Sequence, residues 1–487
     1  MNLVAKLTRH KTVELLRAEL GQRRDFPRTL GVWQLTSIGL GGILGVGIFV
    51  LAGQQAALNA GPAVMIAFII AGIASAAAAM CYAEFAGMIP VTGSSYVYCY
   101  AVLGEFAAWL IGWDLLLEYA LIVAAVASGW SGYLQSILQA AGIPLPVWAQ
   151  GAIGTGEGRV FNLLAAAVAL AVAGLLTLRT EWGARFNTTI VVVKVAGIAL
   201  IIGVGAFYVD PANWVPFIPS QIVGADGVSH FGVSGVVSSA AVVFFAVFGY
   251  DALTTAAEES KNPQRDLPRA IILSLGISMA LYLTISLVLT GIAHYSTLNN
   301  DAPVANAFSA LGLTWISVAI SIAAVTGIVS VVFAFMLGAS RIWFSLARDG
   351  LLPAWFAKVH PRHGTPYRPT LILGVITALA AGFLPLGDLA KLVNIGALSA
   401  FVLICSAVLV LRRRRPDLER GFRTPWVPVV PLIGIGFSIW LLSHLPWATW
   451  ERFLLWMAFG VVIYFGYGIR HSRLAGTPDA APSNTLP

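Results

Sequence analysis

Continuous apolar runs about as long as a membrane is thick recur along this chain and constrain its fold most strongly. Two examples are residues 62–88 and 186–208, each of which carries a single charged residue. A helix needs about 20 apolar residues to cross a hydrocarbon core about 30 Å thick. Hydrophobic residues make up 58% of the 487 residues and charged residues 10%, whereas soluble domains contain about 25% charged residues. A membrane β-barrel shows short alternating segments instead, so the sequence predicts an all-α integral membrane protein.

Twelve apolar segments can be counted along the chain, and we expect each of them to form a transmembrane helix. They cover residues 33–58, 62–88, 104–139, 161–178, 186–208, 231–256, 269–295, 313–344, 368–385, 388–411, 426–444 and 449–469. An even number of spans places both ends of the chain on the same side of the membrane.

Basic residues predict the orientation, because the cytoplasmic loops of membrane proteins carry the excess of Lys and Arg. With the N-terminus inside, only Arg159, Lys391 and Arg452 of the 29 Lys and Arg residues fall outside, apart from one lysine within the fifth segment. We therefore expect a multi-pass protein of the cell membrane with cytoplasmic N- and C-termini. The run 412–415 then anchors a helix at the membrane border, so no nucleic-acid partner is expected.

Missing motifs exclude several classes of protein. The three cysteines form no CxxC spacing, so neither a disulfide framework nor a thiolate metal site is expected. The chain has no GxxxxGK(S/T) phosphate-binding loop and no HExxH metalloprotease motif. Tyr250-Asp251 in an apolar segment is typical of an intramembrane aspartyl protease, but the GxGD motif that such an enzyme also needs is absent. We therefore expect no enzyme activity, no metal and no cofactor.

The first and sixth segments are interrupted at corresponding positions. Residues 41–47 contain four glycines, each of which weakens a helix by about 1 kcal/mol relative to alanine, and a weaker interruption covers residues 245–251. Since the first segment starts inside and the sixth outside, helices 1–5 and 6–10 have the pattern of an inverted repeat. The predicted divisions are a basic N-terminus (1–32), two repeats (33–208 and 231–411), a helix pair (424–469) and a cytoplasmic tail (470–487).

The two interruptions are suited to opposite charges. Free N–H groups beside the N-terminus of the half-helix that follows the glycines would bind a carboxylate. Carbonyl groups freed near Phe245 and Ala246 would face a cation such as an ammonium. Together these features describe a site for an α-amino acid. A second interpretation of the glycine run stays open, because Gly41 and Gly45 also have the spacing of a helix-packing motif.

Charged residues within the predicted helices are candidates for ion coupling. Lys194 lies about 12 Å into the fifth segment, where a charge costs at least about 2.5 kcal/mol and usually serves a function. Burial disfavours the charged form of an amine, so Lys194 can exchange a proton as its exposure changes; alternatively its side chain reaches to the membrane surface. Glu118 would relay protons or hydrogen-bond within the bundle, and Asp251 would cap the second half of the sixth helix.

Three segments of the chain together carry a family resemblance. They are AEESKNPQRDLPRAI at 257–271, then Ser340-Arg341 with ARDGLLP at 347–353 and VHPR at 359–362, and finally GAL at 396–398 with FRTP at 422–425. With Gly-Ile-Phe at 47–49, the chain resembles the amino acid–polyamine–organocation (APC) transporters, and most closely their cationic amino acid transporter-type branch in its twelve-helix bacterial form. The resemblance extends from about residue 28 to about residue 470.

That resemblance implies a LeuT-like fold of two inverted five-helix repeats plus two helices, with the substrate between broken helices 1 and 6. The substrate-binding residues we expect are Ile43, Gly45, Val46, Gly47, Phe245, Ala246, Phe248 and Phe335, with Gly41, Gly42 and Asp251 supporting the helix breaks. Lys194 matches a fifth-helix lysine whose amine is thought to lie where sodium-coupled relatives hold a sodium ion. Glu118 matches an acidic third-helix position associated with the same coupling, and the Phe245 ring would gate the site.

The expected function is proton-coupled symport of L-amino acids into the cytoplasm by alternating access. Phe248 and Phe335 stand where smaller residues would suit long cationic side chains, so we expect neutral and small substrates. The expected partners are the L-amino acid, protons and membrane lipid, and the sequence leaves a small membrane-protein partner open. The alternative is an exchanger of amino acids or polyamines without net proton movement.

Overall fold

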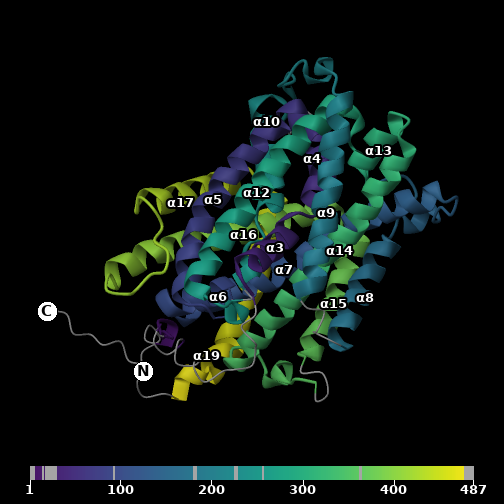
Figure 1. Cartoon of the computed structure of the whole chain (residues 1–487). Coiled ribbons are helices and arrows are strands. Elements are labelled where there is room, and N and C mark those ends of the chain that lie inside the picture. The colour runs from purple at the N-terminus through teal and green to yellow at the C-terminus, as the bar shows by residue number, and fades with distance from the viewer. Residues whose placement is uncertain are drawn as a thin grey trace.

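Helices make up most of the chain that the computed structural model describes, which is residues 6–11, 13, 16, 30–91, 94–178, 184–223, 229–254, 257–360 and 365–476. They form one bundle of long helices (Figure 1). Within these residues the strands are β1 (Ile222–Val223) and β2 (Ser229–His230), which pair antiparallel. Most of the predicted N-terminal segment 1–32 lies outside the described residues, and the tail 470–487 is described only as far as Gly476.

The α-helices follow one another along the chain, and the longest connections lie between α7 and α8 and between α9 and α10. Their bounds are α3 Val32–Ile43, α4 Ala52–Gln55, α5 Val64–Met88, α6 Ser94–Val102, α7 Glu105–Ala140, α8 Leu163–Leu178, α9 Ala184–Gly205, α10 Gly232–Val247, α11 Asp251–Thr254, α12 Pro263–Ile292, α13 Pro303–Ala310, α14 Thr314–Arg348, α15 Tyr367–Phe383, α16 Leu386–Arg414, α17 Val429–Ser443, α18 Trp447–Ile463 and α19 Ile469–His471. Single π-helical turns cover Gly47–Leu51, Ala56–Ala60 and Tyr464–Gly468.

Eight helical stretches in the described chain are long and apolar enough to cross a membrane. They are Gly47–Met88, Glu105–Ala140, Thr189–Tyr208, Gly232–Thr254, Pro263–Ile292, Thr314–Arg348, Leu386–Arg414 and Trp447–His471. Three shorter apolar helices, Leu163–Thr177, Tyr367–Phe383 and Val429–Ser443, lie where further spans are predicted. The all-helical class is therefore confirmed, whereas the count of twelve spans stays a prediction.

One of the eight stretches is too long for a single crossing. Gly47–Met88 has 42 residues and would extend about 63 Å if it were straight, about twice the thickness of a hydrocarbon core. The chain turns within it at Gly61, whose φ of 60° lies in the left-handed region that glycine adopts without strain. This turn falls between the predicted segments 33–58 and 62–88.

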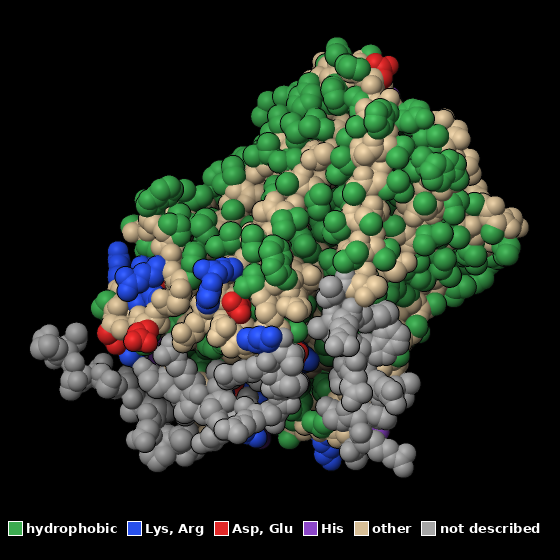
Figure 2. Space-filling model, in the orientation of Figure 1, with side chains coloured by type: hydrophobic (Ala, Val, Ile, Leu, Met, Phe, Trp, Pro, Cys, Tyr) green, Lys and Arg blue, Asp and Glu red, His purple; other side chains and the backbone are tan. Residues whose placement is uncertain are grey.

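On the face seen in Figure 2, basic side chains gather at one end of the bundle. Figure 2 shows Lys and Arg at the lower end, whereas hydrophobic side chains cover most of the remaining face. This distribution is typical of a protein whose apolar girdle contacts lipid and whose basic loops lie in the cytoplasm. The orientation itself stays a prediction.

The centre of the bundle is α7. Of its most apolar window 89% is buried, against 22% for Trp447–His471, so α7 lies among other helices and α18 lies at the periphery. α7 packs against α14 and α16, α5 packs against α10 and α12, and α8 packs against α15. Much of the buried face of α5 is alanine, and such small residues let helices approach closely in a membrane.

Both predicted helix interruptions are present. α3 ends at Ile43 and helix resumes after Leu44, whose ψ of 93° is extended, while α10 ends at Val247 and α11 begins at Asp251. The two breaks touch: a Cβ at Gly42 would lie 2.8 Å from the carbonyl oxygen of Gly249. Gly249 itself has φ of 122°, so a residue without Cβ is needed on both sides of this contact.

Candidate functional site

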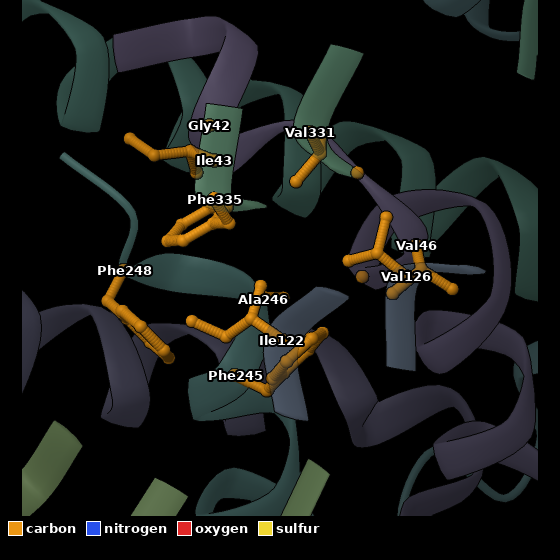
Figure 3. A pocket seen from close by; sticks show the side chains of 12 residues that line it. Gly42, Ile43, Val46, Ile122, Val126, Phe245, Ala246, Phe248, Val331 and Phe335 are labelled. Carbon is orange, nitrogen blue, oxygen red and sulfur yellow. The ribbon is translucent and has the colours of Figure 1, made fainter. Parts of the chain in front are cut away.

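A small pocket lies between the two helix breaks. None of its lining residues has a polar side chain, and they are Gly42, Ile43, Gly45, Val46, Gly47, Ile122, Val126, Phe245, Ala246, Phe248, Val331 and Phe335. Figure 3 shows the side chains from α7, α10 and α14 pointing toward this common space. Its solvent-accessible volume is about 10 Å³, about what one water molecule needs. The site is therefore closed in this conformation and must widen to hold an amino acid.

The expected substrate-binding residues are brought together here. Ile43, Gly45, Val46, Gly47, Phe245, Ala246, Phe248 and Phe335 all line the pocket. Of the residues expected to support the breaks, Gly42 lines the pocket, Gly41 lies in the last turn of α3, and Asp251 is the first residue of α11. The helix therefore continues past Gly41 and Gly42, and Gly42 serves the close contact with Gly249.

Four helix ends meet around the pocket and carry opposite partial charges. The C-terminal ends of α3 at Ile43 and of α10 at Val247 present carbonyl groups, and the helical turns that begin at Gly47 and Asp251 present N–H groups. Some of the carbonyls already have partners: the hydroxyl of Tyr282 donates to Ile43 O at 2.9 Å, and that of Ser75 donates to Val247 O at 2.7 Å.

Aromatic rings and one glycine set the width of the pocket. The rings of Phe245 and Phe248 meet edge to face with centroids 6.3 Å apart, and Phe335 meets Tyr119 in the same way at 5.1 Å. A Cβ at Gly47 would lie 2.2 Å from the Cβ of Ala246. Glycine at position 47 is therefore required for the first broken helix to lie against α10.

Lys194 of α9 is fully buried and binds the end of α3. Its Nζ donates to Leu44 O at 2.6 Å, to Gly41 O at 3.1 Å and to the Ser330 hydroxyl of α14 at 3.3 Å, and its exposed fraction is 0%. Carbonyl groups at a helix C-terminus favour a cation. The side chain therefore joins α9, α3 and α14 and does not reach to the membrane surface, which excludes one of the two interpretations of its sequence.

Three acidic residues are buried within the bundle. Asp114, Glu118 and Asp251 are exposed by only 2%, 3% and 4%. Tyr119 donates to one oxygen of Asp251, but among the described residues each carboxyl keeps one oxygen without a hydrogen-bond partner. Asp114 lies against α16, since a Cβ at Gly396 would be 2.6 Å from its Oδ1. The hydrogen-bonding role considered for Glu118 therefore stays a prediction.

Several pocket and lysine partners were not found from the sequence. Ile122 and Val126 follow Glu118 at intervals of four residues, so they lie on the same face of α7, and Val331 precedes Phe335 by the same interval. This spacing is a signal that identifies all three. Ser330 carries no comparable signal, because single hydroxyl residues are common in membrane helices.

Comparisons with known proteins agree with this architecture. A family model described as amino acid permease matches residues 30–466. The methylthioribose transporter of Bacillus subtilis (strain 168) is 45% identical over 97% of this chain and 100% of its own length. The branched-chain amino acid permease BcaP of the same organism is 45% identical over 96% of this chain and 98% of its own length. The vacuolar cationic amino acid transporter 4 of Arabidopsis thaliana is 37% identical over 80% of this chain and 64% of its own length.

The match covers nearly all of the helical bundle, including both helix breaks and Lys194. The prediction that the chain is not an enzyme is confirmed by the same relatives, which are named as transporters and permeases. The chain is therefore a multi-pass membrane transporter that belongs to the amino acid permease family of the APC superfamily.

Proposed function

We propose that this protein carries neutral, apolar L-amino acids into the cytoplasm together with protons, by alternating access. The observation that supports the proposal most is Lys194, a buried amine bound to the end of a broken helix beside the pocket. The proposal includes twelve transmembrane helices, arranged as the inverted repeats 33–208 and 231–411 and the helix pair 424–469. It also places the protein in the cell membrane, with both termini in the cytoplasm.

The lining of the pocket supports neutral, apolar substrates. None of its side chains carries a charge or a hydrogen-bonding group, so a charged or hydroxylated substrate side chain would lose its hydration without compensation. Relatives named for branched-chain amino acids, at 45% and 32% identity, agree with this choice. Another relative is named for methylthioribose. The hydroxyl groups of such a thiosugar would find no side-chain partner in this lining, so we favour amino acids as the substrates.

The substrate's two charges would be bound by backbone. We assign its carboxylate to the N–H groups at the turn that begins at Gly47, and its ammonium to the carbonyl groups at the end of α10, near Phe245 and Ala246. The α3 carbonyls are not available for this purpose, because Lys194 and Tyr282 hold them. The Phe245 ring, which lines the pocket, would move to admit the substrate.

The hydrogen bonds of Lys194 favour its protonated form. A protonated amine has three N–H donors, and Lys194 has three acceptors: two carbonyl groups of α3 and one hydroxyl of α14. A neutral amine has one donor fewer and lacks the stronger, charge-assisted bonds. We propose that inward opening wets the amine, that its proton leaves to the cytoplasm, and that α3 is thereby released from α9 and α14. Glu118 is proposed to take part in the same proton exchange.

Uptake of labelled L-valine into proteoliposomes tests this function. An inward proton gradient should drive accumulation without sodium, and uptake should fall as external pH rises. Lys194→Ala should abolish gradient-driven accumulation but retain exchange of internal for external valine. The matched control is Lys391→Ala, which removes a partly exposed lysine beside Asp388 and should accumulate valine like the wild type.

Two results would reject the proposed coupling. Full gradient-driven accumulation by Lys194→Ala would remove the lysine from the mechanism. Wild-type transport that occurs only as exchange and ignores the proton gradient would favour the amino acid or polyamine exchanger.

A further inference from the structure

A second and larger cavity lies at the end of the bundle where α4 is seen in Figure 1, away from the Lys and Arg side chains of Figure 2. We call it the distal cavity. Its walls are α4, the C-terminal part of α7, and the segments 150–162, 299–301 and 384–387. Its solvent-accessible volume is about 350 Å³, within the range of about 300–1,000 Å³ typical of small-molecule sites.

The distal cavity leads to the closed pocket. α7 lines both: Ile122 and Val126 face the pocket, and Gly129 and neighbouring residues face the distal cavity. A Cβ at Gly129 would lie 1.9 Å from a methyl carbon of Val46, and Val46 lines the pocket. The two spaces are thus separated by about one side chain, so a substrate from this end passes through the distal cavity first.

The walls of the distal cavity are polar and held in place. Gln135 donates to Ser131 and to the carbonyl oxygen of residue 150, both at 2.8 Å, and Ser131 donates to Asn162 at 2.6 Å. Gln54 donates to Asn300 O at 3.2 Å. These bonds hold α4 against the segment 299–301 and α7 against the segment 150–162 before any ligand arrives.

The lining carries one positive and one negative side chain. They are Arg159 and Asp301, which form an ion pair with Nη1 2.8 Å from Oδ2. Their side chains are 22% and 47% exposed, and such partly exposed pairs contribute only about 0–1 kcal/mol. Asp301 is held over α7, since a Cβ at Gly132 would lie 2.4 Å from its carbonyl oxygen. The pair can therefore open at little cost while both residues stay at the cavity.

We propose that the distal cavity is a second binding site for an α-amino acid zwitterion, in which Arg159 binds the carboxylate and Asp301 binds the ammonium. The zwitterion replaces the ion pair with two charge-assisted contacts, and the planar guanidinium suits a carboxylate. Because the lining has no other charged side chain, a substrate with a net charge leaves that charge without a partner. The inference rests on the proposed function in assuming that amino acids enter from this end.

Protection of a thiol in the distal cavity tests the proposal independently of transport. The three native cysteines are buried, so Leu58→Cys, at a lining position that is 42% exposed, supplies the reactive thiol for a membrane-impermeant maleimide. At about ten times its Kd, a bound ligand slows labelling about tenfold. L-valine should protect the thiol, whereas isobutylamine and isovalerate, which each lack one charge of valine, should not.

Variants locate the ligand that protects. Val331→Trp and Val126→Trp each fill the closed pocket, and protection should persist in both, with monodispersity checked by size-exclusion chromatography. Arg159→Gln and Asp301→Asn should lose protection. Arg452→Gln is the matched control, because it removes another arginine of a partly exposed ion pair, 3.7 Å from Asp388, and should keep protection.

The opposite pattern overturns the proposal. Protection that survives Arg159→Gln but disappears in both tryptophan variants would place the ligand in the closed pocket alone, and equal protection by isobutylamine would remove the zwitterion. Absence of valine protection in the Leu58→Cys protein that carries no further substitution, with intact proton-driven uptake, rejects the distal site and leaves the proposed function standing. Valine protection without proton-driven uptake supports the site and rejects the coupling.

Discussion

Replacing Gly327 of α14 with alanine should impair proton coupling without removing the amine to which we assign it. A Cβ at this position would lie 3.1 Å from Cβ, 3.0 Å from Cγ and 2.8 Å from Cε of Lys194. These contacts are closer than the separation of about 3.5–4.0 Å that carbon atoms prefer. Because two of them involve the part of the side chain nearest the backbone, rotation of the distal stem does not relieve them, and the amine is displaced from the carbonyl groups of α3.

The cost can be bounded from the two terms involved. Adding one methyl group to a packed core costs about 1–3 kcal/mol, and the higher helix propensity of alanine returns up to about 1 kcal/mol. The net cost of up to about 2 kcal/mol applies only to conformations in which Lys194 binds α3, and it changes their population by up to about 30-fold. We therefore expect gradient-driven uptake to fall by about that factor.

The assay is the initial rate of labelled L-valine uptake into proteoliposomes with an inward proton gradient. Exchange without a gradient, measured in the same vesicles, reports on the substrate pocket. Gly203→Ala is the matched control, since it makes the same change on the helix that carries Lys194, where a Cβ meets nothing within 4 Å. A wild-type rate for Gly327→Ala, or an equal loss in the control, would refute the reasoning.

Three further changes have expected outcomes. Gly249→Ala should reduce the yield of monodisperse protein on size-exclusion chromatography, because φ of 122° is strained for alanine; a normal yield would contradict the tight contact of the two breaks. Glu84→Gln leaves two bound arginines without their carboxylate, which costs about 3–5 kcal/mol for a buried pair. Thermal unfolding of this variant, followed by tryptophan fluorescence, should therefore occur at a lower temperature than for the wild type. Asp417→Asn, which removes an exposed ion pair, should not lower the unfolding temperature. Burial and the charge of a nearby arginine lower the pKa of His10 below 6.5. Protonation of His10 therefore favours states in which residues 6–11 have left the bundle, and the packing of this segment against the bundle weakens as pH falls below 6.5. The rate of hydrogen exchange of residues 6–11, corrected for intrinsic rates, should rise as pH falls below 6.5. It should not rise in the His10→Gln variant.

The helical class and both helix breaks were predictable because they depend on local properties of the chain. Long apolar runs and glycine clusters are visible within windows of about 20 residues, and the breaks at 44–46 and 248–250 fall inside the two predicted interruptions. The exact end of α3 was not predictable. Gly42 lies within α3, and its lack of a Cβ allows the close contact with Gly249, which is more than 200 residues away in sequence.

The candidate site was predictable from its backbone but not from its distant partners. The eight expected pocket residues do line one cavity, since they flank the breaks. The environment of Lys194 is different: depth along a helix says nothing about direction, and the acceptors of its amine lie on α3 and α14. Whether such a lysine reaches to the surface or stays buried depends on these acceptors, which only the folded bundle brings together.

In the proposed cycle, the ammonium groups of Lys194 and of the substrate would bind the two helix breaks, which lie against each other. This arrangement explains how the proton and the substrate can be coupled. Lys194 binds the carbonyl groups of Gly41 and Leu44, whereas the intervening Ile43 lines the substrate pocket. The α10 end, assigned to the substrate ammonium, meets α3 through the contact of Gly42 with Gly249. In the proposed cycle, loss of the proton would weaken the hold on α3, and the same movement would alter one wall of the pocket and its contact with the other break. A proton and a substrate can therefore be coupled here without touching each other.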